Sequence, residues 1–203
     1  MKIGDIKIEA IKLMFTNYSF DMGIDDLQKL VSDENYGSYI VNMNGSINRA
    51  LDRIQNACVL APKAHTFSSS NNLTLFRYDL KNISDLYLID RVSSWLNKTE
   101  YCPSISFYIE GDKLILENTG DEYTILYFPT IKSLTNEDAD TDDMWLPDYI
   151  ARLIPYFIKS DLYQEEEPDL AAAARNLFEA SLDDIKTQRQ MNQSFVHQTY
   201  RMF

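Results

Sequence analysis

Residues 35–58 of this 203-residue chain read NYGSYIVNMNGSINRALDRIQNAC and carry the clearest structural pattern in the sequence. Polar residues alternate there with an apolar stripe whose members recur every three or four positions. The stripe consists of Tyr36, Tyr39, Ile40, Met43, Ile47, Ala50, Leu51, Ile54 and Cys58. Because Pro62 limits any continuation, we expect one amphipathic helix of about 25 residues, roughly 37 Å long, as the spine of a helical domain.

The same spacing predicts helices on both sides of this spine. A first helix is expected over residues 3–14 and a short one over 25–31. After an acidic segment, a helix opening at Pro147 and kinked at Pro155 is expected to run to Leu162. A last helix opens at Pro168, and its apolar periodicity fails beyond Gln190.

Between these helices the sequence changes character. Runs at 73–79, 86–89, 105–109, 113–117 and 122–128 are rich in β-forming residues. The last three are separated by Glu110-Gly111-Asp112 and by residues 118–121, both favourable hairpin-turn sequences. Alternating polar and apolar residues in these runs predict a half-buried antiparallel meander.

Together these patterns predict an α+β fold that is mainly helical. We expect the N- and C-terminal helices to form a bundle, with a small antiparallel β-sheet inserted between them. The expected parts are an N-terminal helical part (1–63), the inserted β region (64–132), a C-terminal helical hairpin (133–191) and a C-terminal arm (192–203).

The charge restricts the possible partners. Nineteen Lys and Arg residues against 31 Asp and Glu residues give a formal net charge of −12. Proteins that grip nucleic acid place basic residues against phosphates, so this balance argues against DNA binding as the main activity. No run reaches the roughly 18 apolar residues that a membrane span needs, and no secretory signal is evident at the N-terminus. Only two cysteines occur, which fits a reducing compartment.

No recognisable catalytic arrangement is present, and we expect no enzyme activity and no cofactor. His65, His197 and Cys58 fall outside any known nucleophile motif. The acidic run at 138–143 imitates a calcium loop, but Asp143 stands at its glycine position and Tyr149 at its terminal glutamate position. We therefore expect a solvated linker without metal. A carboxylate-dependent hydrolase stays as a distant alternative.

The C-terminal arm is unusual for a chain end. Phe195, Tyr200, Met202 and Phe203 place four large apolar residues among the last nine. Exposed termini are usually poor in such residues, because leaving them in water gains nothing. Two interpretations remain open: an arm folded back onto its own domain, or an interface that orders on a neighbouring subunit or partner.

Three segments carry a resemblance to a known family. They are 153–163 (LIPYFIKSDLY), 165–179 (EEEPDLAAAARNLFE) and 35–54. In these segments, and in its order of helices, β region and helical hairpin, the chain resembles head–tail connector (neck adaptor) proteins of tailed bacteriophages. The residues that carry the resemblance are structural and form no catalytic fingerprint.

The resemblance implies a structural virion protein. Such proteins form a ring of about twelve identical subunits below the portal, joining capsid to tail around the DNA exit channel. The implied partners are further copies of the chain, the portal protein and a downstream tail or neck protein. The implied location is the virion neck, assembled in the host cytoplasm.

An acidic ring would let DNA pass without binding it specifically, because carboxylates repel phosphates. Asp138, Asp140, Asp142 and Asp143 are the candidates for facing that channel. The competing hypothesis is an acidic inhibitor that mimics DNA and occupies a basic protein. It would need a regular row of carboxylates on one face, whereas the acids here cluster in linkers and turns.

Overall fold

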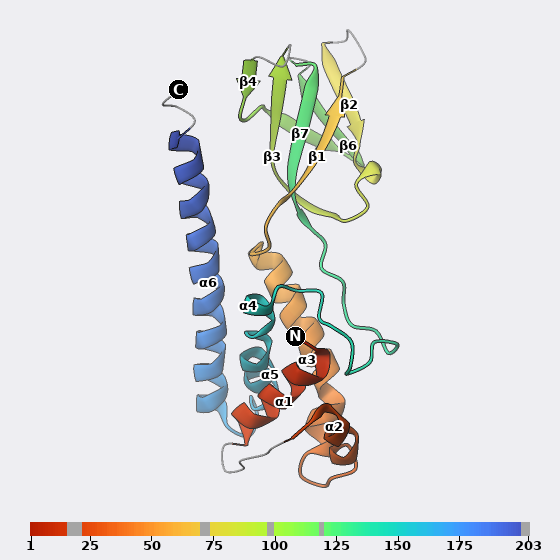
Figure 1. Cartoon of the computed structure of the whole chain (residues 1–203), viewed down its shortest axis with the longest axis vertical. Coiled ribbons are helices and arrows are strands. Elements are labelled where there is room, and N and C mark those ends of the chain that lie inside the picture. The colour runs from red at the N-terminus through yellow and green to blue at the C-terminus, as the bar shows by residue number, and fades with distance from the viewer. Residues whose placement is uncertain (16–21, 70–73, 97–99, 118–119, 200–203) are drawn as a thin grey trace. The chain divides into compact units, whose positions relative to one another are not determined.

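The computed structural model describes residues 1–15, 22–69, 74–96, 100–117 and 120–199, with side chains described up to residue 190 (Figure 1). The chain divides into two compact units. The first combines Met1–Val59 with Lys132–Phe203, and the second consists of Leu60–Ile131. The second unit is therefore inserted between the two segments that build the first.

The first unit is helical in its described residues. In chain order its helices are α1 (Ile3–Met14), α2 (Ile24–Leu30), α3 (Gly37–Ala57), α4 (Asp148–Ala151), α5 (Ile154–Leu162) and α6 (Pro168–Thr199). Helix α5 packs against α1, α3 and α6 and so joins the N-terminal to the C-terminal segment. Its Phe157 ring lies edge-on to Phe178 of α6, with the ring centroids 5.1 Å apart.

The predicted central helix is confirmed as α3, with 21 residues. Its apolar stripe is the buried face, and Met43, Ile47, Ala50 and Ile54 are completely inaccessible to solvent. The helix ends before Pro62, because Cys58 adopts a left-handed conformation with φ of 53° and turns the chain away.

The C-terminal helices differ from the prediction at two points. Instead of one kinked helix, α4 and α5 are separate, and Pro155 lies in the first turn of α5, where its missing N–H breaks no helical bond. Helix α6 continues to Thr199, so the expected arm at 192–203 is helical for most of its length. Loss of apolar periodicity did not end this helix, because polar residues with good helix propensity can extend it.

The second unit consists of strands. They are β1 (Lys63–Ser68), β2 (Leu75–Asp79), β3 (Leu86–Leu96), β4 (Glu100–Cys102), β5 (Phe107–Glu110), β6 (Lys113–Glu117) and β7 (Glu122–Pro129), with a 3-10 turn η1 (Leu80–Asn82) after β2. Two antiparallel sheets result, with strand orders β1-β7-β3-β4 and β2-β6-β5.

These two sheets share one core. Val92, Tyr123 and Ile125 from the first sheet are fully buried in one cluster with Leu114 and Leu116 of β6. Phe67 of β1 stacks on Phe76 of β2, with ring centroids 5.5 Å apart, and on Tyr123 at the same separation. The unit is thus stabilised by apolar and aromatic side chains interdigitating between the sheets.

The prediction of a mainly helical fold with a terminal helix bundle around one small sheet is wrong. The described residues contain seven strands in two antiparallel sheets, and the inserted unit has its own core. The sequence did not predict strands β1 and β4, because neither has the run of apolar residues that is typical of a buried strand. Residues 63–68 of β1 are mostly polar, and β4 has only three residues.

The expected three-strand meander is also wrong. The turn at Gly111, whose φ is 59°, joins β5 to β6 as a hairpin. After β6, however, the chain crosses to the other sheet, where β7 pairs with β1 and β3. A Cβ at Gly120 would lie 2.9 Å from the carbonyl oxygen of Trp95, so the crossing chain needs a glycine at this close approach.

Candidate functional site

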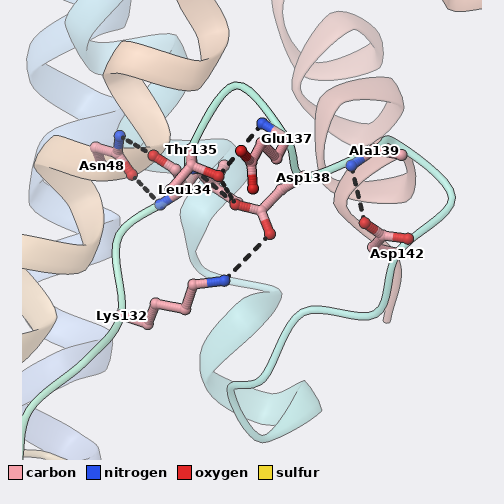
Figure 2. A network of polar contacts seen from close by, with 8 residues as sticks. All are labelled: Asn48, Lys132, Leu134, Thr135, Glu137, Asp138, Ala139 and Asp142. Carbon is pink, nitrogen blue, oxygen red and sulfur yellow. Dashed lines mark hydrogen bonds and ion pairs between the residues drawn. The ribbon is translucent and has the colours of Figure 1, made fainter.

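The acidic segment between the second unit and α4 is the candidate site that the sequence singled out. Figure 2 shows that it forms a hydrogen-bonded loop. The Asn48 side chain of α3 anchors its start: the backbone N–H of Leu134 donates to Asn48 Oδ1 at 2.7 Å, and Asn48 Nδ2 donates to the Leu134 carbonyl at 3.1 Å. Both backbone groups of the buried Leu134 are thereby satisfied.

Asp138 closes the first turn of this loop. One carboxylate oxygen accepts hydrogen bonds from the backbone N–H of Thr135 at 2.7 Å and from its hydroxyl at 2.8 Å. The other oxygen lies 3.3 Å from Lys132 Nζ, and 15% of the Asp138 side chain is exposed. These hydrogen bonds, the backbone one first, lower the pKa of Asp138 below its ordinary value.

Asp140 connects the loop to α1. Its carboxylate accepts a 2.6 Å hydrogen bond from Lys7 Nζ, and only 8% of the Lys7 side chain is exposed. Its carbonyl accepts from the backbone N–H of Gly4 at 2.8 Å. A Cβ on Gly4 would lie 2.9 Å from that same carbonyl oxygen, so glycine permits the loop to approach the helix.

Asp142 and Asp143 complete the contact with the start of α1. The carbonyl of Asp142 accepts from the backbone N–H of Ile3 at 3.0 Å, and its carboxylate accepts from that of Ala139 at 2.8 Å. Asp143 forms an isolated antiparallel bridge with Lys2. Carbonyls of this loop thus satisfy N–H groups of the first turn of α1, which have no partner within the helix.

The expectation of a solvated acidic linker is therefore corrected. The carboxylates of Asp138, Asp140 and Asp142 all have protein partners. These are Lys132 and Thr135 at the start of the loop, Lys7 on α1, and the backbone of Ala139 within the loop, respectively. Asp142 and Asp143 are largely exposed, whereas Asp138 and Asp140 are half-buried. Within the described ranges, no group of three or more His, Cys, Asp or Glu residues is placed to hold a metal ion.

Two acids of the C-terminal helices, Asp161 and Glu179, are also paired, with arginines of α3. Arg49 binds Asp161 with its Nη2 2.5 Å from Oδ2, and Arg53 binds Glu179 at 2.6 Å. Arg175 reaches Glu179 at 3.1 Å, and its guanidinium lies 4.4 Å from the centre of the Phe157 ring. Bonds from Arg53 lower the pKa of Glu179. The sequence analysis did not predict these ion pairs, although the four-residue spacing of Arg49 and Arg53 places both side chains on one face of α3.

Tyr39 belongs to the same face of α3 and donates a hydrogen bond to Glu166. Burial, followed by this bond, raises the pKa of Tyr39. Glu166 is one of the three consecutive glutamates before α6, all exposed. Its contact with α3 ties that turn to the helical core.

The predicted interface residues at the C-terminus are only partly placed. Phe195 lies within α6, and its side chain is not among those described. Tyr200, Met202 and Phe203 lie outside the described residues. The two interpretations of the arm therefore remain as the sequence left them.

The histidines and cysteines are divided between the two units. His65 lies in the second unit, where its Nε2 is 2.5 Å from the Tyr78 hydroxyl and links β1 to β2. His197 lies in the part of α6 whose side chains are not described. Cys58 ends α3 in the first unit and Cys102 lies in β4 of the second, and neither is in a disulfide.

One open cleft of about 680 Å³ lies in the first unit, between α1 and the α4–α5 segment. The amino group of Met1 binds Asp148 at 2.8 Å beside it, and this bond raises the pKa of the amino group and lowers that of Asp148. Glu9, Lys12 and Arg152 also line it. Positive and negative groups are mixed, so the cleft favours neither an anion nor a cation.

Comparison with protein-family models and with curated proteins identifies no relative of this chain. No helix in the described part of the chain is long and apolar enough to cross a membrane.

Proposed function

We propose that this chain is a structural virion protein of a tailed bacteriophage, a head–tail connector that forms a ring below the portal. In this role it joins capsid to tail, surrounds the DNA exit channel and catalyses no reaction. Its partners are further copies of itself, the portal protein and a downstream tail or neck protein. It is assembled in the host cytoplasm and resides in the virion neck.

The observation that carries the proposal is the packing of the three segments that resemble the connector family. Most of segment 35–54 lies in α3, segment 153–163 contains all of α5, and segment 165–179 covers the turn before α6 and its first part. These helices contact one another directly, and α3 is ionically linked to both partners through Asp161 and Glu179. Three segments that are separate in the sequence thus pack against one another, as expected if together they form the helical scaffold common to the connector family.

Surface charge agrees with a channel that DNA crosses. The net charge of −12 repels phosphate, and the exposed carboxylates lie in both segments of the first unit. Among the four candidate channel residues, Asp142 and Asp143 are exposed enough to contribute. Asp138 and Asp140 mainly stabilise the loop, so the channel charge must come largely from elsewhere on the ring.

The DNA-mimic alternative gains no support from these contacts. A mimic presents unpaired carboxylates to the basic residues of its target. Here Asp138, Asp140, Asp161 and Glu179 are engaged by cations of the same chain. A nuclease competition assay at low salt would still reveal such an inhibitor if DNA cleavage fell with added protein.

Assembly of the purified full chain tests the proposal. We expect rings in negative-stain electron microscopy, and a sedimenting species many times heavier than the 23.6 kDa chain, alone or with the portal protein of the same virus. The control is the portal protein without the chain. Monomers alone at every concentration, with and without portal, would overturn the connector role.

A further inference from the structure

Sheet β2-β6-β5 of the second unit has two open edges. Strands β2 and β5 each pair with β6 and with no other strand in the described part of the chain. On its outer side each edge strand presents a row of backbone N–H and C=O groups that lack a strand partner. Soluble proteins usually protect such edges, because another strand can add to them.

Both edges also expose apolar side chains. Tyr108 and Ile109 of β5 are 54% and 53% exposed, and Leu75 of β2 is 44% exposed. Consecutive residues of a strand point to opposite faces, so β5 is apolar on both faces of its edge. An edge with these features favours an added strand.

Charge distinguishes the two edges from each other. Glu110 of β5 and Arg77 of β2 are both exposed, and neither forms an ion pair within the described residues. Pairing of two β5 edges would bring an acidic strand to an acidic strand. Strand β2 carries both Arg77 and Asp79, so pairing of β5 with β2 of another copy allows Glu110 to face Arg77, provided the register keeps it away from Asp79.

Strand direction fits the same arrangement. Both β2 and β5 run antiparallel to β6 and therefore parallel to each other. A second copy that is related to the first by rotation about an axis along the strands keeps the same strand direction. Its β2 can therefore lie parallel to β5 of the first copy. Repetition of such a head-to-tail contact closes a ring when the rotation divides a full turn.

We propose that β5 of one subunit pairs in parallel with β2 of the next copy, so that the sheet continues from subunit to subunit. The matching register sets Tyr108 opposite Leu75, Ile109 opposite Phe76 and Glu110 opposite Arg77. Tyr108 and Glu110 share one face of β5, and Leu75 and Arg77 share the corresponding face of β2. Apolar groups then meet apolar groups, and the unpaired charges meet each other.

This register differs by two residues from the alignment inside one subunit, where Arg77 and Tyr108 both lie opposite Ile115. Such a stagger tilts the strands relative to the ring axis, as in a closed barrel. The inference rests on the self-assembly that the proposed function requires, with the β5 and β2 edges as the assembling surfaces.

Charge reversal tests the contact in the full chain. We expect Glu110→Arg and Arg77→Glu each to raise the concentration needed for assembly by about tenfold or more, because each places like charges at every junction. Asp52→Arg on α3, also exposed and distant in sequence from both edges, is the matched control and should assemble like the wild type.

Mixing provides the decisive measurement. When the two single variants are combined in equal amounts, every junction between alternating copies again joins opposite charges, so assembly should return. The double variant should assemble alone. Rings from either single variant at wild-type concentration, or no rescue on mixing, would overturn the proposed pairing and leave the connector role standing. A wild-type chain that never assembles would overturn both.

A cross-link covers the case in which charge reversal impairs folding. In a chain with Cys58→Ser and Cys102→Ser, the pair Glu110→Cys and Arg77→Cys should give a ladder of covalent oligomers on oxidation. Each single cysteine variant can give dimers at most. A ladder is expected, and its absence from assembled protein contradicts the register.

Discussion

The ammonium group of Lys7 lies 2.6 Å from a carboxylate oxygen of Asp140, a residue 133 positions further along the chain. Only 8% of the lysine side chain is exposed. Asp140 therefore replaces water as the hydrogen-bond acceptor and counter-charge of the Lys7 ammonium group. The pair holds the acidic loop against α1 and connects the two sequence segments of the first unit.

Removal of the carboxylate should therefore be costly. We expect Asp140→Ala to lower the free energy of unfolding by about 2 kcal/mol, because Lys7 keeps its charge without a partner. Urea denaturation followed by tryptophan fluorescence, to which Trp145 of the same loop and Trp95 of β3 contribute, measures the change. Lys7→Met should cost less than Asp140→Ala, since it removes the buried charge itself.

The exposed pair Lys12–Glu9 is the matched control. Its atoms are 3.5 Å apart and its side chains 41% and 54% exposed, so Glu9→Gln should change stability by about 0.5 kcal/mol or less. Equal effects of Asp140→Ala and Glu9→Gln would show that the Lys7–Asp140 pair behaves as an ordinary surface contact.

Two glycines of the first unit should respond in opposite directions to the same substitution. A Cβ at Gly4 would lie 2.9 Å from both the Asp140 carbonyl oxygen and a side-chain carbon of Ile24, so Gly4→Ala should destabilise by about 1–3 kcal/mol. At Gly45, inside α3, the nearest atom is the end of Arg49 at 3.5 Å. Gly45→Ala should stabilise by roughly 0.5–1 kcal/mol.

Thermal unfolding of both variants and the wild type checks this pair of predictions. A stabilised Gly4→Ala protein would mean that the loop does not approach α1 as closely as described. The two substitutions are chemically identical, so their difference isolates the close approach from the general effect of removing a glycine.

Glu179 makes stability depend on acid pH. Its pKa lies below the ordinary value of 4.5 because Arg53 and Arg175 stabilise the carboxylate in the folded chain. A lowered pKa contributes stability that is complete above the unfolded value and is lost as pH falls through the folded one. We expect wild-type stability to decline more steeply below about pH 4.5 than that of Glu179→Gln, by about 1 kcal/mol in total.

Melting temperatures between pH 3 and 7 provide the measurement. Glu165→Gln, which changes an exposed carboxylate before α6, serves as the control and should follow the wild-type curve. Parallel curves for wild type and Glu179→Gln would indicate that Arg53 does not hold this carboxylate in solution.

Local patterns predicted the helices better than the connections between elements. The stripe through Ile40, Ile47 and Ile54 determines α3 because a buried face must repeat with the helical period. The same rule located α1, and Asp25 in a first turn located α2 within one residue of its observed bounds. Helix ends were predicted less well. Helix α6 continues to Thr199, beyond the loss of periodicity at Gln190, and Pro155 lies in the first turn of a new helix instead of kinking a longer one.

Sheet pairing could not be read from the sequence. Gly111 and Gly120 both lie in favourable turn sequences, yet only the first joins two strands of one sheet. A turn sequence tells where the chain reverses, whereas the partner of the following strand depends on the packed core. The half-buried strand predicted at 113–117 is also more deeply packed than alternation implies, because Leu114, Ile115 and Leu116 of β6 are all buried.

The partners of the acidic loop were hidden for a similar reason. Five carboxylates in seven positions predicted hydration, because sequence shows a cluster of charge but not the cations that face it. Lys7 and Asn48 come from helices far away in the chain. Only the fold brings them beside Asp140 and Leu134.

Asn48 offers the last test of this loop. Its side chain satisfies both backbone groups of Leu134, which is 7% exposed, so Asn48→Ala leaves a buried N–H and C=O without their partners. We expect a loss of about 1–3 kcal/mol and faster hydrogen exchange at the Leu134 amide. Asn42→Ala, on the same helix, removes one exposed bond to the Ser38 carbonyl and should cost a few tenths of a kcal/mol. If exchange at Leu134 is equally slow in both variants, another group protects this amide and Asn48 does not anchor the loop.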